Sequence, residues 1–194
     1  TIAVQCCSRA QLESEDTVMI VGSGALGSSI LRIVKLYNPK AIIVTDIDDA
    51  KLEEAKKNGA TYTINSLKED VPAKAHELTD GYGPTVTIDA ACVKGSLLTA
   101  LQATGNAGRV ITMGFSVAPT EVNQFVITSK ELDVRGSRLQ NRKFQDVIDL
   151  VNEGKVDLRG SISHTWNFED AQAAFDFVDS RDPSYRKGVL TFKK

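Results

Sequence analysis

Short runs of β-branched and other apolar residues alternate along the chain with segments of helical periodicity. The runs predicted to form strands are residues 17–21, 41–45, 61–64, 85–90, 109–113 and 132–136. Between them, apolar residues recur on one helical face, as in Leu26, Ile30, Ile33, Val34 and Tyr37. Strands that alternate with helices form βαβ units around a parallel sheet. We therefore expect a doubly wound α/β fold with six parallel strands.

The end of the chain has a different pattern. After Gly160 it offers one helix near residues 171–178 and one strand at 189–192, with no evident partner for either. We expect residues 1–160 to form the sheet domain, with an entering helix and linker at 1–16. Residues 161–194 are expected to be a tail that packs on another part of the protein. Because the chain begins with Thr1 rather than Met, we expect a piece of a longer protein.

Composition and charge limit the possible partners. The 194 residues are 42% hydrophobic and 25% charged, which is ordinary globular usage. With 23 Lys and Arg against 25 Asp and Glu, the chain has no basic field for nucleic acid. No apolar run approaches the ~20 residues of a membrane span, and no signal peptide opens the chain. Cys6, Cys7 and Cys92 form neither a disulfide framework nor a zinc clip, so we expect a cytoplasmic protein.

A glycine-rich turn directly follows the first predicted strand and opens the first helix. It consists of Gly22, Ser23, Gly24, Ala25, Leu26 and Gly27. In the Rossmann fold this spacing gives a tight turn, a close backbone approach to a pyrophosphate and close helix–strand packing, with the anion at the helix N-terminus. A glycine turn without a ligand is the alternative. The context favours a six-stranded Rossmann sheet that binds a dinucleotide.

Asp46 ends the second predicted strand, 19 residues after Gly27. A carboxylate there accepts hydrogen bonds from the ribose hydroxyls of NAD and repels the 2′-phosphate of NADP. Ile47 and Lys51 follow, and no Arg lies beside them. We therefore expect NAD as the cofactor. The alternatives are that Asp46 caps a helix and that Lys51 is a solvated helix residue.

Two further segments lie where the fourth and fifth predicted strands end. They are Ala90, Ala91 and Cys92, and then Met113, Gly114 and Phe115. Ligands of open α/β sheets bind at this carboxyl edge. The small residues of the first segment leave room for an adenine ring, although a buried loop without a ligand is equally consistent. The second segment could border the nicotinamide.

The sequence does not contain the motifs of several other classes of enzyme. Ser28 and Ser29 stand where a P-loop needs Lys followed by Ser or Thr. No Tyr has a Lys four residues later, and no Gly-x-Ser-x-Gly elbow occurs. His76 and His164 have no Cys, Glu or second His at metal-ligand spacing, so structural roles are expected for both.

These segments together resemble the cofactor domain of the zinc-type medium-chain alcohol and polyol dehydrogenases. The resemblance rests on TVMIVGSGALG at 17–27, VTDI at 44–47, IDAA at 88–91 and GRVITMG at 108–114, and it covers essentially the whole chain. GSR at 136–138, GKV at 154–156 and ISH at 162–164 resemble the sorbitol, idonate and galactonate dehydrogenase branch, with its starvation-sensing dehydrogenase-like proteins. Ala25-Leu26 departs from the pairs usual in the family but leaves the glycines in place.

The resemblance implies an enzyme that oxidises a secondary alcohol of a polyol or sugar acid by hydride transfer to NAD. It implies that a GroES-like catalytic domain outside this chain holds the zinc, that residues 161–194 return to that domain, and that this segment alone is inactive. It also implies that Arg138 faces the cofactor cleft, although a surface charge is the alternative, and that a homo-oligomer, a dimer or tetramer, forms through the sixth strand. A free-standing NAD(H)-sensing module and an S-adenosylmethionine-binding domain remain alternative functions.

Overall fold

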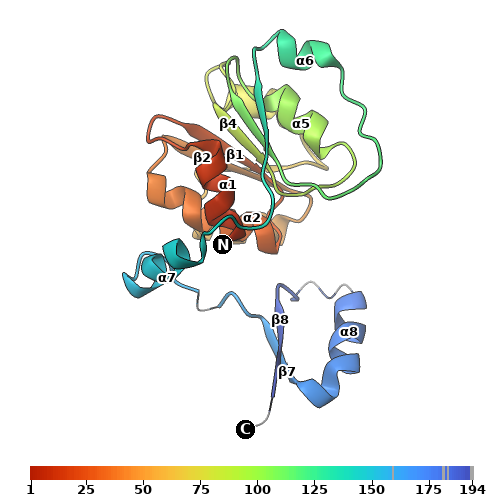
Figure 1. The fold of residues 1–194 in the computed structure, drawn as a ribbon. Coiled ribbons are helices and arrows are strands. Elements are labelled where there is room, and N and C mark those ends of the chain that lie inside the picture. The colour runs from red at the N-terminus through yellow and green to blue at the C-terminus, as the bar shows by residue number, and fades with distance from the viewer. Residues whose placement is uncertain (159, 181, 183, 193–194) are drawn as a thin grey trace.

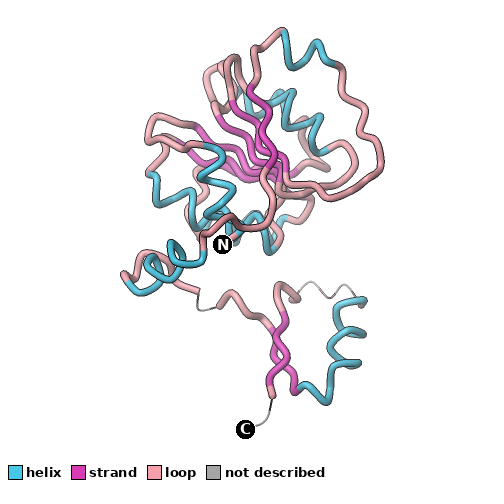
Figure 2. Tube along the Cα trace, in the orientation of Figure 1, coloured by secondary structure: helices cyan, strands magenta, loops and turns pink. Residues whose placement is uncertain are grey.

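Six parallel strands form the central sheet of the computed structural model, which describes residues 1–158, 160–180, 182 and 184–192 (Figures 1 and 2). The strand order is β3-β2-β1-β4-β5-β6, so the predicted doubly wound fold is confirmed. The strands are β1 (Thr17–Val21), β2 (Ala41–Asp46), β3 (Tyr62–Asn65), β4 (Val86–Asp89), β5 (Arg109–Thr112) and β6 (Asp133–Gly136). The order reverses between β1 and β4, which is the switch point where ligands bind in such sheets.

Helices cover both faces of the sheet. They are α1 (Ile2–Ala10), α2 (Ala25–Val34), α3 (Asp49–Lys57), α4 (Val71–Glu77), α5 (Ser96–Ala103), α6 (Gln124–Thr128), α7 (Phe144–Asn152) and α8 (Ala171–Asp179), with short 3-10 helices at Lys35–Tyr37 and Phe168–Asp170. Apolar residues of α1, α2 and α3 pack on one face, and those of α4 and α5 pack on the other. Within the described ranges, no helix is long and apolar enough to cross a membrane.

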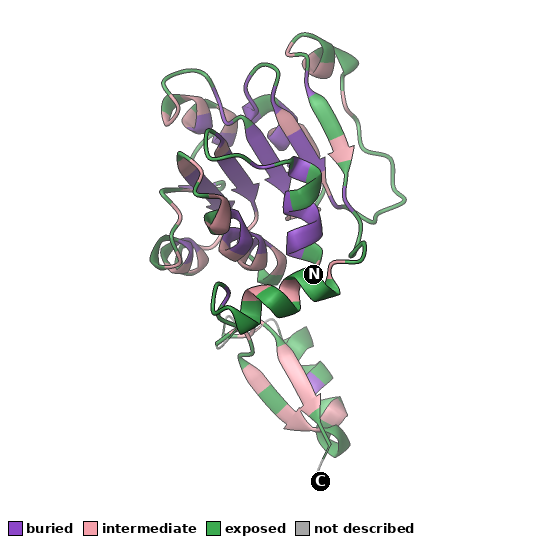
Figure 3. Cartoon of the chain, turned by 60° about the vertical axis from the view of Figure 1, so that its left-hand side comes forward, coloured by how far each residue is buried: buried purple, intermediate pink, exposed green. Residues whose placement is uncertain are grey.

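The core is two-sided because alternate residues of each strand point to opposite faces. In β1, Val18 and Ile20 pack beneath α1 and α2, whereas Met19 and Val21 pack beneath α4 and α5. A strand buried on both faces reads as a continuous apolar run. Figure 3 shows the strands at the centre of the sheet buried and the outer face of α7 exposed.

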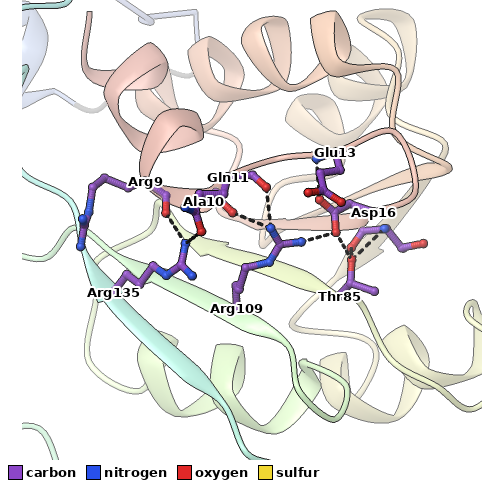
Figure 4. Close-up of polar contacts among 9 residues, drawn as sticks. Arg9, Ala10, Gln11, Glu13, Asp16, Thr85, Arg109 and Arg135 are labelled. Carbon is purple, nitrogen blue, oxygen red and sulfur yellow. Dashed lines mark hydrogen bonds and ion pairs between the residues drawn. The ribbon is translucent and has the colours of Figure 1, made fainter.

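A polar network fixes α1 to the edge of the sheet away from the glycine turn (Figure 4). The Arg109 guanidinium donates to the backbone oxygens of Ala10 and Gln11 and pairs with the buried carboxylate of Asp16. Asp16 also accepts a hydrogen bond from Thr85 Oγ1, 2.7 Å away. Carbonyls at the end of α1, which lack intrahelical partners, are satisfied in this way.

The tail corrects one expectation from the sequence. Residues 161–194 contain a second strand, β7 (His164–Asn167), which pairs in parallel with β8 (Gly188–Thr191), so the expected strand does have a partner. Aromatic rings hold this unit together. His164 stacks on Trp166 with ring centroids 5.4 Å apart, and the ring centroids of His164 and Phe177 of α8 are 4.6 Å apart. The long connection between β5 and β6 contains the short helix α6.

Among the residues that the structure describes, two polar contacts join the tail to the sheet domain. Arg32 of α2 donates to Ser161 Oγ at 2.5 Å, and Arg186 pairs with Glu54 of α3. Exposed apolar side chains remain on the tail, including Phe168, Phe175 and Phe192. Figure 1 shows the tail set apart from the sheet domain.

Candidate functional site

The glycine turn lies at the switch point, between β1 and α2, and two of its glycines are required by the backbone. Gly22 has φ +94° and passes so close to Ala91 that an added Cβ would lie 3.0 Å from the Ala91 backbone. A Cβ on Gly27 would lie 1.9 Å from the carbonyl oxygen of Gly22. Both glycines therefore serve close packing, as the motif predicts.

Gly24 is different because no described atom lies within 4 Å of the position that its Cβ would take. It is the N-cap of α2, and no side chain there accepts from the helix. The first-turn N–H groups of Ala25, Leu26 and Gly27 have no intrahelical acceptor, and the helix dipole favours an anion beside them. The space in front of Gly24 is thus open and suited to a phosphate group.

Asp46 lies beside this turn at the end of β2. Its Oδ2 accepts from the backbone N–H of Ser23 at 2.7 Å, and its Oδ1 accepts from those of Ile47 and Asp48 at 2.9 and 3.1 Å. The N-cap of α3 is Asp48, whose carboxylate accepts from Ala50 N, so Asp46 does not cap that helix. Oδ2 accepts a single one of these hydrogen bonds and keeps acceptor capacity, and the carboxylate is fixed beside the open end of α2.

A cleft of about 670 Å³ runs along this edge of the sheet. Of the residues predicted for the site, its lining includes Gly22, Gly24, Asp46, Ile47, Lys51, Ala90 and Ala91. Ile47 and Val93, which are 61% and 66% exposed, also line it. Exposed aliphatic side chains at the rim of a cleft can hold a flat apolar ring between them.

The remaining predicted residues outside the glycine turn form a second group, which follows β4, β5 and β6 and consists of Cys92, Met113, Gly114, Phe115 and Arg138. The Arg138 guanidinium carbon lies 4.8 Å from the centre of the Phe115 ring, a cation–π contact. Gly114 lies next to Cys92, since an added Cβ would be 3.9 Å from Cys92 Cβ. The Met113 side chain is only 5% exposed and belongs to the core. Of the segment predicted as a wall, Gly114 and Phe115 are thus the exposed part.

Cys92 is not an activated nucleophile. Burial, and then the nearby Asp89 carboxylate, raise the pKa of its thiol above the usual value. A reactive cysteine needs a lowered pKa and a positive environment. Its φ of +54° instead marks a tight bend in the loop between β4 and α5.

Sequence reasoning missed part of the cleft. Two further walls come from the segment that leads into the first turn of α4 and from the loop that leads into the first residue of α5. They include Ser66, Glu69, Asp70, Pro72, Val93, Lys94, Gly95 and Ser96. These residues form no motif of their own. The signal that could have found them is their position, because every one lies beyond the carboxyl end of β3 or β4.

The two histidines have structural surroundings. His76 Nδ1 lies 3.0 Å from the backbone oxygen of Gly81, and His164 lies in the aromatic cluster of the tail. In the part of the chain that the structure describes, no three His, Cys, Asp or Glu side chains gather where they could hold a metal ion. The described residues therefore do not fit a zinc site.

Comparison with known proteins places this geometry in a family. The profile of the zinc-binding dehydrogenases matches residues 25–153. The starvation-sensing protein RspB of Escherichia coli is 36% identical over 195 aligned residues, which cover all of this chain and 57% of RspB. Sorbitol dehydrogenase of Gallus gallus is 26% identical over 179 residues, which cover 91% of this chain and 50% of that enzyme.

A solved structure gives the same result. The alcohol dehydrogenase RspB of E. coli CFT073, complexed with NADH, superposes with a TM-score of 0.89 at 36% identity, covering 98% of this chain and 56% of that one. The chain thus spans about half the length of the relatives it matches. The resemblance drawn from the sequence motifs is confirmed: the chain belongs to the zinc-binding dehydrogenase family and corresponds to its cofactor-binding domain.

Proposed function

We propose that the chain is the NAD(H)-binding half of a zinc-dependent oxidoreductase that oxidises a secondary alcohol of a polyol or sugar acid by hydride transfer. One observation carries the proposal. The Asp46 carboxylate, fixed by three backbone N–H groups, shares a cleft with Gly24 at the uncapped N-terminus of α2. An anion site next to a ribose-binding carboxylate is the pair of groups that a dinucleotide needs.

Different residues of the cleft would bind different parts of the dinucleotide. The first turn of α2 would donate to the pyrophosphate, with Gly24 leaving room for its approach. Asp46 would accept from the adenosine ribose hydroxyls, and Lys51 would lie beside them. Ile47 and Val93 would flank the adenine. Glu69 and Asp70, which also line the cleft, add negative charge that disfavours a 2′-phosphate.

The group formed by Cys92, Gly114, Phe115 and Arg138 would border the nicotinamide, with the Met113 backbone beneath it. When bound, the cofactor supplies the hydride acceptor. The protein's part is then to hold the ring at the edge of the sheet and to shield one side of it from water. No residue of this chain is proposed as catalytic, and we place the zinc ligands outside it.

Two partners complete the proposal. The apolar surface of the tail would meet the catalytic domain outside this chain, and a second copy would meet β6. Sheet order supports the second contact, because β6 is an edge strand whose Val134 is 39% exposed. Light scattering of the chain would test it: a monomer at all concentrations up to the millimolar range would contradict pairing through β6.

Calorimetric titration of NADH and NADPH tests the cofactor assignment. The chain should prefer NADH, and Asp46→Ala should lose most of that preference because the ribose acceptor and the repelling charge are both removed. Asp49→Ala is the matched control, since Asp49 pairs with Lys68 and is not among the residues lining the cleft. Equal affinity for both nucleotides in the unaltered chain, or an unchanged preference in Asp46→Ala, would contradict the proposal.

A further inference from the structure

A buried carboxylate, Asp89, ends β4 directly below the cleft. Its residue is only 2% exposed, although a charged group is seldom buried without a specific partner. Its Oδ1 accepts from the backbone N–H of Cys92 at 3.1 Å, and its Oδ2 lies 2.8 Å from Ser96 Oγ. Cys92 belongs to the segment that connects β4 to α5, and Ser96 is the first residue of α5, so the carboxylate contacts this segment within its length and at its end.

The segment carries a wall of the cleft. Of its six residues, 90–95, all but Cys92 line the cleft, as does Ser96 at the start of α5. Val93, the exposed aliphatic residue of this wall, is fixed at its backbone: its N–H donates to Ser96 Oγ at 3.1 Å, and its carbonyl oxygen lies 2.8 Å from the same hydroxyl. Asp89 thus reaches the wall through Ser96 as well as through Cys92.

The bend of this segment is unfavourable without such a clamp. Cys92 has φ +54°, in the left-handed region that a side chain with a Cβ avoids. The neighbouring Gly95, with φ +89°, meets the same demand at no steric cost. A hydrogen bond from Cys92 N–H to a carboxylate is of the stronger, charge-assisted kind and offsets the strain at this residue.

We propose that Asp89 is a positioning residue for the cofactor: it holds Cys92 in its left-handed conformation and so places Val93 and Lys94 against the adenine half of the dinucleotide. The proposal rests on the proposed function for its ligand. It concerns no atom that touches the cofactor, since Asp89 acts only through the segment it clamps. It also explains why a charged group stands at this buried position, where the sequence alone shows only the end of a strand.

The test compares the effect of Asp89→Ala with and without the backbone strain at Cys92. Asp89→Ala should weaken NADH binding about tenfold, the change expected when one charge-assisted hydrogen bond that orders the wall is lost. Cys92→Gly is the reference for the double variant, since it removes the strain at the bend but also alters a residue placed beside the nicotinamide. Because Gly adopts the bend without a clamp, adding Asp89→Ala to Cys92→Gly should weaken NADH binding far less than Asp89→Ala does in the unaltered chain. Thr104→Ala is the stability control: it removes a buried hydroxyl bonded to Thr87, at the far end of α5.

Hydrogen exchange gives a second readout that needs no cofactor. The Cys92 and Val93 amides should exchange faster in Asp89→Ala than in the unaltered chain and should be unaffected in Thr104→Ala. Unchanged exchange in Asp89→Ala overturns the clamp. So does a loss of NADH affinity, on adding Asp89→Ala to Cys92→Gly, that equals the loss caused by Asp89→Ala in the unaltered chain. If the unaltered chain does not bind NADH while the exchange results hold, the proposed function fails and the clamp stands.

Discussion

The packing role and the binding role of the glycine turn can be separated by adding the same methyl group at Gly27 and at Gly24. In Gly27→Ala the new Cβ would lie 1.9 Å from the Gly22 carbonyl oxygen, more than an ångström inside any normal carbon–oxygen contact. The obstacle is backbone, so α2 and β1 must move apart. Overpacking of this kind costs about 1–3 kcal/mol and occasionally more, a large part of a typical stability of about 5–15 kcal/mol.

Gly24→Ala adds its methyl group to open space and leaves the fold intact. Its backbone, with φ −68° and ψ −167°, is accessible to alanine, and replacing glycine by alanine at a helix N-cap changes stability by about 1 kcal/mol at most. The cost falls on binding, because the methyl group occupies the approach to the helix N-terminus. We expect NADH affinity to fall at least about tenfold, or about 1.4 kcal/mol.

Urea unfolding and NADH calorimetry on both variants complete the test. Gly27→Ala should unfold at a clearly lower urea concentration, whereas Gly24→Ala should unfold near the unaltered chain and bind NADH poorly. A Gly24→Ala protein with unaltered affinity would refute the placement of the pyrophosphate. A Gly27→Ala protein of unaltered stability would refute the packing argument.

Other consequences concern stability. Arg109→Met should destabilise the fold by about 3–5 kcal/mol, as expected when one partner of a buried ion pair is removed, because Asp16 is left buried and unpaired; Lys40→Met, which breaks the exposed pair with Glu15, should cost less than about 1 kcal/mol in the same urea experiment. Burial raises the pKa of the Cys6 thiol to about 12 from its ordinary 9.0. The folded state therefore keeps a proton that the unfolded state loses, and stability should fall between about pH 9 and 12 by up to about 1.4 kcal/mol per pH unit from this thiol. Cys6→Ala should flatten that decline, and an identical pH profile would contradict the assignment. At pH 8, iodoacetamide should modify the half-buried Cys92 before the buried Cys6 and Cys7, as read by mass spectrometry; faster labelling of Cys6 would contradict the burial argument.

The sheet could be predicted because its signals are local. The inner strands β1 and β2 are short and largely apolar runs bounded by turn residues, because a strand buried on both faces must be apolar on both. The glycine turn could also be predicted from the sequence. Gly22 and Gly27 occupy positions where a side chain would collide with neighbouring backbone. Asp46 could be predicted because it lies 19 residues after Gly27, near the spacing at which a Rossmann fold places its ribose-binding carboxylate.

The rest depends on contacts that are distant in the sequence. β7 (His164–Asn167) mixes polar and aromatic residues and becomes a strand only by pairing with β8, more than twenty residues later. Met113 continues the inward alternation of β5, so its side chain entered the core although its segment reaches the cofactor edge. The walls made by Val93 and Asp70 have no motif because a loop beyond a strand accepts many types of residue.

The central claim is that a dinucleotide binds across the carboxyl edge of β1, β2 and β4. A titration of the ¹⁵N-labelled chain with NADH, followed by amide chemical shifts, tests it most directly. We expect large shift changes in the turn 22–27, at Ile47 and in the segment 90–95, with none in the tail at His164–Asn167. Changes confined to the tail or to the α1 network, or a spectrum unaltered at millimolar NADH, would contradict it.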